Sequence, residues 1–225
     1  RARAHAAPRC CAPRSDESAD PTDAVYADLK GRLKRTNLFF VGMMGSGKST
    51  VAARVASGLQ YRLLDTDSII ETATRKAISD IFRDEGEQAF RELESSVLEQ
   101  AHSYIGCCVS TGGGVVTYRR NWSFLQSGLV VWLDADVDVL FGRLQHDTTR
   151  PLLQTPDPRA TLQDIFKARR EWYAQADVRV PIDAADSTDA IALDVCRRLN
   201  TFVKEHPPRF SAVYPSNLSK QPEND

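Results

Sequence analysis

Residues 42–49 read Gly-Met-Met-Gly-Ser-Gly-Lys-Ser and match the phosphate-binding pattern G-x-x-x-x-G-K-[ST]. An apolar run at residues 38–41 precedes the pattern and predicts a buried strand, and residues 49–59 predict a helix. Glycines at 42, 45 and 47 let the backbone turn tightly and aim N–H groups at a phosphate. The amino terminus of the following helix adds partial positive charge. The chain is therefore predicted to bind a nucleoside triphosphate.

Each position in this loop has an expected part in nucleotide binding. Lys48 can reach the β- and γ-phosphates, and the Ser49 hydroxyl can hold Mg²⁺. The residues expected to bind ATP here are Gly45, Ser46, Gly47, Lys48, Ser49 and Thr50.

Strand patterns alternate with helix patterns along the chain. Strands are expected at residues 38–41, 61–67, 107–110, 130–133 and 178–182. Helices are expected at residues 23–34, 49–59, 68–75, 78–82, 88–104, 137–144, 161–175 and 189–204. This alternation predicts an α/β fold, a parallel sheet covered on both faces. Residues 146–159 are polar and contain prolines, and are expected to form a long mobile loop.

Ligands bind such sheets at the carboxyl ends of the strands. Asp65 and Asp67 follow one predicted strand, and one carboxylate near Mg²⁺ with another near an acceptor hydroxyl would suit phosphoryl transfer. Asp67 could instead cap the next helix. Gly112, Gly113 and Gly114 follow another strand and would allow a ligand to approach the backbone, or would form a flexible connection.

The arginines are ambiguous when each is taken by itself. Arg91 and Glu94 have the spacing of a surface ion pair on a helix. Arg150 lies in the long loop, where it could close over phosphates or simply face solvent. Arg169 and Arg170 could belong to a charged helix face.

The composition fits an ordinary soluble globular protein. The 225 residues are 42% hydrophobic and 26% charged, with a formal net charge of -1. Nothing in this charge directs the chain to nucleic acid or to a membrane surface, and no apolar run approaches the roughly 20 residues that span a bilayer. The spacing of the five cysteines predicts neither a zinc site nor a disulfide framework.

Three regions are expected along the chain. Residues 1–34 form an extension that contains four arginines and no acidic residue before position 15, typical of an organelle transit peptide but also compatible with a disordered tail. Residues 35–206 form the P-loop domain, and residues 207–225 a disordered tail. No role is expected from the sequence for Cys10 and Cys11.

Taken together, the motifs resemble those of the shikimate kinases, small P-loop kinases with the nucleoside monophosphate kinase fold. The resemblance covers residues 37–200 and rests on the order and spacing of several segments. These are Gly42 to Ser49, Asp65-Thr-Asp67, Asp80-Ile-Phe82, Gly86 to Glu94, Gly112 to Gly114, Arg150-Pro-Leu-Leu153 and Arg169-Arg-Glu-Trp-Tyr173.

The resemblance implies ATP-dependent phosphorylation of the 3-hydroxyl of shikimate, with Mg²⁺ as cofactor. It implies that Arg91 and Arg169 clamp the shikimate carboxylate and that Asp67 holds the accepting hydroxyl. The catalytic residues would be Lys48, Asp67 and Arg150, with Asp65 near the metal and Arg143 stacked on adenine. It further implies substrate contacts from Phe82, Phe90, Glu94, Gly112, Gly113 and Gly114.

The resemblance also implies a five-stranded, three-layer P-loop fold with a mobile lid loop. A monomer or weak homodimer without nucleic-acid or membrane partners is expected, and the sequence does not decide between the two assemblies. A plant or algal member would carry a plastid transit peptide, with a cytoplasmic location as the alternative. Residues 185–190 lack a proline expected in the adenine-contacting loop, so adenine contacts there stay open. Two rival functions remain, another small-molecule kinase such as a gluconate or nucleotide kinase, and a non-catalytic paralogue.

Overall fold

The computed structural model describes residues 21–145 and 151–207. Five strands within them form one parallel sheet in the order β2-β3-β1-β4-β5. The strands are β1 (Leu38–Val41), β2 (Arg62–Asp65), β3 (Cys107–Ser110), β4 (Leu129–Ala135) and β5 (Val178–Ile182). The predicted five-stranded parallel sheet is therefore confirmed.

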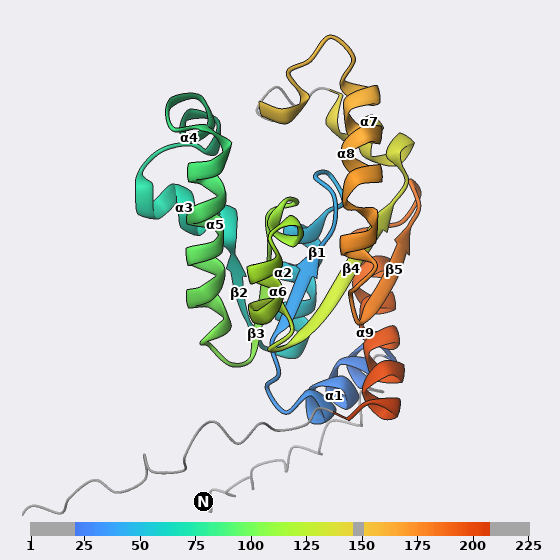
Figure 1. Ribbon diagram of the computed structural model, residues 1–225. Helices are drawn as coiled ribbons and strands as arrows, with labels where there is room; N and C mark the ends of the chain where they lie inside the picture. Colours follow the sequence, from blue (N-terminus) through green and yellow to red (C-terminus); the bar gives the residue numbers. More distant parts are fainter. Residues whose placement is uncertain (1–20, 146–150, 208–225) are drawn as a thin grey trace, which may run out of the picture.

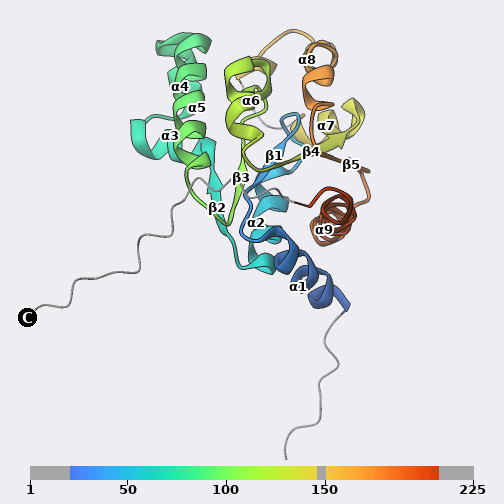
Figure 2. The same ribbon diagram turned by 60° about the horizontal axis from the view of Figure 1, so that its bottom comes forward.

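Helices cover both faces of the sheet (Figure 1). They are α1 (Pro21–Leu33), α2 (Lys48–Leu59), α3 (Thr66–Thr74), α4 (Ile78–Asp84), α5 (Gly86–His102), α6 (Arg119–Leu125), α7 (Val137–Leu144), α8 (Pro158–Tyr173) and α9 (Thr188–Glu205). Figure 2 shows α2 and α9 on one side of the sheet and α6 and α8 on the other. The central strand β1 and its neighbour β3 are buried throughout, as the three-layer arrangement requires.

Helix α1 packs into the core through one of its faces. Its residues Tyr26, Leu29 and Leu33 are buried, and they belong to the same hydrophobic cluster as the sheet. The Tyr26 ring lies over Gly58 of α2, where a Cβ atom would come within 2.4 Å of the ring. A glycine at position 58 is therefore required by this contact.

The strand expected at residues 61–67 is shorter, and it ends at Asp65. Asp65 caps α3, because its carboxylate accepts a hydrogen bond of 3.1 Å from the Ser68 N–H. Asp67 lies in the first turn of that helix. The prediction that Asp67 could be the cap was therefore wrong, because the helix begins two residues earlier than expected.

Of the long loop expected at residues 146–159, the structure describes residues 151–159, and part of this stretch is helical. A 3-10 turn spans Pro151–Leu153, and α8 begins at Pro158, where the Asp157 carboxylate accepts from the Ala160 N–H at 3.0 Å. The sequence predicted no element between residues 110 and 130, where the structure has a 3-10 turn (Val115–Thr117) and α6. Arg150, Cys10 and Cys11 lie outside the described residues.

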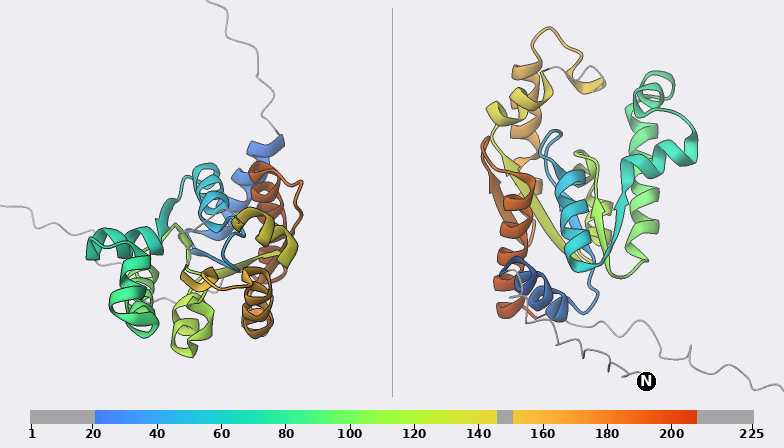
Figure 3. Two further views of the ribbon diagram at one scale, coloured as in Figure 1. Left: turned by 90° about the horizontal axis from the view of Figure 1, so that it is seen from above. Right: turned by 180° about the vertical axis from the view of Figure 1, so that it is seen from behind.

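The carboxyl ends of the strands meet at one edge of the sheet, seen from above in the left panel of Figure 3. Asp65 of β2 is opposite Ser110 of β3, and Ser110 is opposite Phe40 of β1. The P-loop, the first turn of α3 and the glycines after β3 consequently lie next to one another.

Candidate active site

The P-loop turns at Gly42 and again at Gly47, immediately before α2. Gly42 has a φ of +144°, and a Cβ atom there would lie 2.5 Å from the Leu133 carbonyl oxygen. Gly47 has a φ of +88° and is the N-cap of α2. Both positions therefore require glycine, and they direct the backbone toward the amino terminus of α2.

Lys48 and Arg143 bring positive charge to this loop. The Lys48 ammonium donates to the carbonyls of Gly42 (3.0 Å) and Met43 (2.9 Å), which holds it against the loop. Arg143 of α7 is exposed and donates to the Gly45 carbonyl at 3.2 Å. The P-loop residues expected to bind ATP thus lie together with Arg143, and they include buried Ser46 and exposed Thr50 in the first turn of α2. Arg150, the remaining residue of that prediction, lies outside the described residues.

Oxygen atoms of Ser49, Asp65 and Ser110 meet beside the loop. The Ser49 hydroxyl donates to an Asp65 carboxylate oxygen at 2.6 Å and lies 3.1 Å from the Ser110 hydroxyl. Hydroxyl and carboxylate oxygens are ligands that suit Mg²⁺. Sequence reasoning missed Ser110, although a small polar residue at the end of a buried strand is a usable signal.

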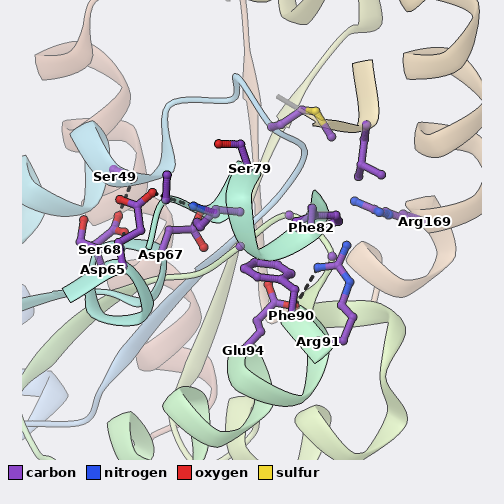
Figure 4. A pocket seen from close by; sticks show the side chains of 18 of the residues that line it. Ser49, Asp65, Asp67, Ser68, Ser79, Phe82, Phe90, Arg91, Glu94 and Arg169 are labelled. Atoms are coloured by element: carbon purple, nitrogen blue, oxygen red, sulfur yellow. Dashed lines mark hydrogen bonds and ion pairs between the residues drawn. The ribbon is translucent and has the colours of Figure 1, made fainter. Parts of the chain in front are cut away.

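A cavity of about 620 Å³ opens next to the P-loop (Figure 4). Its walls come from the P-loop, from α3, α4, α5 and α8, and from the glycines after β3. The predicted site residues that line it are Ser49, Asp65, Asp67, Phe82, Phe90, Arg91, Glu94, Gly112, Gly113, Gly114 and Arg169. Lys48 and Arg143 do not line this cavity, and both lie at the P-loop.

Arg91 is buried and is held by two carboxylates of its own helix. Its guanidinium donates to Glu94 at 2.9 Å and to Glu87 at 2.9 Å, while its side chain is only 5% exposed. Burial lowers the pKa of Arg91, but the charges of Glu94 and Glu87 outweigh burial and raise it. The interpretation of Arg91 and Glu94 as a surface pair was therefore wrong, and both hold fixed positions in the cavity wall.

Arg169 reaches the same cavity from α8. It is 9% exposed, and Figure 4 shows Arg91 and Arg169 pointing toward one region of the cavity from opposite walls. Its neighbour Arg170 is exposed. The structure thus separates two adjacent arginines that the sequence could not tell apart, and it brings two planar guanidinium groups together.

Tyr173 lies one helical turn beyond Arg169 and is completely buried. Its hydroxyl donates to the Gly113 carbonyl at 2.5 Å, and its ring stacks on Trp132 at 5.9 Å. Burial raises the pKa of Tyr173 to about 12. Tyr173 therefore fixes the backbone of the glycine segment, a role that the sequence did not assign to it.

Two of the glycines after β3 make room for charged side chains of the protein itself. A Cβ atom on Gly112 would lie 2.0 Å from a Glu94 carboxylate oxygen, and one on Gly114 would lie 2.2 Å from the Arg91 guanidinium. The Arg91–Glu94 pair therefore occupies the space where side chains at these two positions would lie. The glycines themselves line the cavity, so the prediction that a ligand approaches their backbone stays a prediction.

Glu94 and Asp67 place two carboxyl groups near the two arginines. Burial raises the pKa of Glu94 and the charge of Asp67 raises it further, against the lowering effects of Arg91 and Arg169. Phe82 and Phe90 add an apolar wall, with ring centroids 4.7 Å apart. The cavity thus joins paired guanidinium groups, carboxyl groups and an apolar surface, a combination suited to a small hydroxylated carboxylic acid.

Known proteins with similar sequences include shikimate kinases. A family model described as "Shikimate kinase" matches residues 44–200. A shikimate kinase of Nostoc sp. is 46% identical over 177 residues, which cover 79% of this chain and 98% of the relative. One of Synechococcus elongatus is 48% identical over 157 residues, which cover 70% of this chain and 83% of the relative.

Solved structures with a similar fold also include shikimate kinases. A shikimate kinase from Acinetobacter baumannii in complex with shikimate aligns with a TM-score of 0.71 and 32% identity, covering 80% of this chain and 99% of that one. A shikimate kinase from Aquifex aeolicus aligns with a TM-score of 0.65 and 26% identity, covering 76% and 99%. Among the described residues, no helix is long and apolar enough to cross a membrane.

Proposed function

Because the chain belongs to the shikimate kinase family, we propose that it transfers the γ-phosphoryl group of ATP to the 3-hydroxyl of shikimate. The products are shikimate 3-phosphate and ADP. The observation that carries this proposal is the meeting of Arg91 and Arg169 in one cavity beside the P-loop, with Asp67 at its edge. This arrangement matches a substrate that carries a carboxylate at one end and a reacting hydroxyl at the other.

The P-loop binds the phosphates of ATP, with Lys48 neutralising charge on the β- and γ-phosphates. Ser49 and Asp65 are the residues that would hold Mg²⁺, and the 2.6 Å hydrogen bond between them supports this assignment because it places the two oxygens side by side. The metal supplies neutralisation of phosphate charge. Arg143 lies over the P-loop, where its guanidinium can stack on adenine.

The cavity orients shikimate. Arg91 and Arg169 hold the carboxylate through paired hydrogen bonds, and Asp67 accepts a hydrogen bond from the attacking hydroxyl. The Gly113 backbone, fixed by Tyr173, borders the substrate. Catalysis then rests mainly on position and on charge stabilisation, as expected for phosphoryl transfer.

Arg150 is proposed to reach the phosphates when the loop that carries it closes. Closure would remove water from the site and suppress hydrolysis of ATP. Arg150→Ala is therefore expected to lower kcat and to raise the share of ATP turnover that occurs without shikimate. A ratio of hydrolysis to transfer equal to that of the unmodified protein would count against this role.

The activity is tested by a coupled assay of ADP release with Mg-ATP, with and without shikimate, beside gluconate and nucleoside monophosphates. ADP release that depends on shikimate alone supports the proposal. Turnover with another acceptor would keep the P-loop assignment but discard the roles of Arg91 and Arg169. ATP binding without turnover on any acceptor would indicate a non-catalytic paralogue.

The carboxylate clamp is tested by Arg169→Lys, with Arg170→Lys as the matched control. An ammonium cannot form the paired bonds of a guanidinium, so KM for shikimate is expected to rise about tenfold or more with little change in kcat. Arg170→Lys changes the same chemistry at an exposed position and should leave KM unchanged. In contrast, Lys48→Ala and Asp67→Ala should lower kcat.

A plastid location is also proposed, with the cytoplasm as the alternative. The Arg-rich, acid-poor composition before residue 15 and the similarity to cyanobacterial relatives support it. Import of a fluorescent protein fused behind residues 1–34 into isolated chloroplasts would test it. A monomer or weak homodimer is proposed as the assembly, and light scattering at several concentrations would measure it.

A further inference from the structure

A second cleft, of about 590 Å³, lies at the amino-terminal ends of β2 and β3. These strand ends are at the bottom of Figure 1, at the opposite end of the sheet from the P-loop. Three connections form the cleft, and backbone hydrogen bonds join them: Gly106 donates to Arg35 at 2.7 Å, and Arg62 donates to Gly106 at 3.1 Å. The lining residues are Lys30, Arg35, Gln60, Tyr61, Arg62, Ser103, Tyr104, Ile105, Gly106 and Cys107.

Within the part of the chain that the structure describes, the charged side chains that line this cleft are all cationic. They are Lys30, Arg35 and Arg62. Among the described residues, none of these three cations forms an ion pair with a carboxylate, and the Lys30 ammonium donates to the Gln60 side-chain oxygen. Several exposed arginines elsewhere do form such pairs, namely Arg54, Arg83, Arg120, Arg159, Arg179 and Arg198.

The positive charges of Arg35 and Arg62 both act on the thiol of Cys107, which lies in the wall of the cleft. Burial raises the pKa of Cys107, and the positive charges of Arg62 and Arg35 both act in the opposite direction. Arg35 has a similar effect on the pKa of Tyr61, which burial raises to about 12. The geometry agrees for Arg35, because a Cβ atom on Gly106 would lie 3.5 Å from the Arg35 Nε and 3.9 Å from the Tyr61 ring. The Tyr61 phenol stays protonated at neutral pH and can donate a hydrogen bond beside Arg35.

The outer part of the cleft is apolar. Tyr104 and Ile105 are 52% and 51% exposed, and both line it. The Tyr61 ring adds a third apolar surface. A ligand that fills the cleft would thus meet cations at one part and aromatic and aliphatic side chains at another.

We propose that this cleft binds a small organic anion that joins a phosphate or carboxylate group to a flat apolar body. The anionic group lies between Arg35, Arg62 and Lys30, and the apolar body lies against Tyr104 and Ile105. Guanidinium groups suit both anions, because each presents paired oxygen atoms. The cleft volume falls within the range of small-molecule sites.

The test is isothermal titration of the full chain with phenyl phosphate, in the presence of saturating Mg-ADP and shikimate. These two ligands occupy the P-loop and the neighbouring cavity, so phosphate binding there does not contribute. Benzoate tests the carboxylate form, inorganic phosphate tests the anion alone, and benzyl alcohol tests the apolar body alone. Saturable 1:1 binding of phenyl phosphate or benzoate that weakens with added salt is expected.

The Arg35→Gln/Arg62→Gln variant is expected to weaken this binding at least tenfold. The matched control is Arg119→Gln/Arg197→Gln, which removes two exposed guanidinium groups from α6 and α9 and should leave binding unchanged. Tyr104→Ala should weaken phenyl phosphate more than inorganic phosphate. Kinase activity and melting temperature of each variant show that it is folded.

Three results would overturn the proposal. The first is no binding of phenyl phosphate or benzoate up to about 10 mM, where a specific site of this size should be detected. The second is equal weakening by the two double variants, which would indicate attraction by overall charge. The third is equally strong binding of benzyl alcohol, which would indicate an apolar cleft without anion selectivity.

Discussion

At the scale of single residues, the wall of the substrate cavity requires glycine at two positions. Gly112 and Gly114 have no side chains, and the Glu94 carboxylate and the Arg91 guanidinium occupy the space beside them. These buried groups hold each other at 2.9 Å. A small change at either glycine therefore acts directly on the charges that define the cavity.

The first prediction concerns Gly112→Ala. The new methyl group would lie 2.0 Å from a Glu94 oxygen, so Glu94 must move and its bond to Arg91 must weaken. We expect kcat/KM for shikimate to fall at least about tenfold. The control is Gly31→Ala, a helical glycine with nothing within 4 Å of its added Cβ atom. That change should leave kinetics unaltered and stabilise the protein by about 0.5–1 kcal/mol.

The second prediction concerns the pH dependence caused by Glu94. Burial raises its pKa above the ordinary value of 4.5, so the folded protein holds this proton more tightly than the unfolded chain. The stability that the protonated group contributes is complete below the unfolded pKa and is lost as pH rises through the folded pKa. The free energy of unfolding of the unmodified protein, relative to Glu94→Gln, should therefore fall as pH increases.

Urea denaturation between about pH 4 and pH 8 would measure this difference. Glu92→Gln on the same helix is the matched control, because it makes the same change at an exposed position. A difference for Glu94→Gln that grows with pH would contradict the prediction. It would mean that Arg91 favours the ionised carboxylate more than burial disfavours it.

At the scale of elements, α1 is an integral part of the packed domain, although it precedes the residues 44–200 matched by the family model. Its buried face contacts the same core as the sheet, and α2 and α9 lie beside it in Figures 1 and 2. The strand ends organise the other elements in the same way, since Asp65 both ends β2 and caps α3. A residue such as Asp65 therefore positions two elements of the fold and also lines the substrate cavity.

The third prediction concerns Leu29, which is completely buried in α1. Leu29→Ala leaves a cavity in the main core, so we expect it to destabilise the protein by about 2–5 kcal/mol. Leu29→Met keeps most of the volume and should cost less than about 1.5 kcal/mol. Chemical denaturation measures both. If Leu29→Ala cost less than Leu29→Met, α1 would not be packed as described.

At the scale of the whole molecule, one core unites both layers of helices, and it contains three cysteines. Cys107, Cys108 and Cys196 are all buried, and burial raises the pKa of each thiol, that of Cys196 to about 12. Their reaction with a thiol reagent requires both exposure and a thiolate. Alkylation therefore reports opening of the core.

The fourth prediction is that a Cys10→Ser/Cys11→Ser variant reacts very slowly with a thiol reagent at about pH 8 in its folded state. The same variant in denaturant should react rapidly at the three remaining thiols. Absorbance of the released thiolate measures both rates. Rapid reaction of a thiol in the folded variant would show that one of these cysteines is reached without opening the core.

The sequence by itself determined the features that depend on neighbouring residues. The pattern from Gly42 to Ser49, the strand before it and the helix after it are local, because glycine conformation and apolar periodicity act within a few residues. The parallel sheet followed from alternating elements. The start of α3 was misplaced because helix boundaries depend on which side chain caps the first turn, here Asp65.

Only the tertiary structure decided what the arginines and glycines of the cavity contact. Arg91 has the spacing of a surface ion pair, and Arg169 cannot be told from Arg170 by sequence, until burial separates them. The Glu94 carboxylate lies beside Gly112, and the Tyr173 hydroxyl donates a hydrogen bond to the Gly113 carbonyl. These residues are far apart in the sequence, so no local pattern predicts the contacts. The physical reason is that burial and the energy of a charged pair depend on every element packed around them.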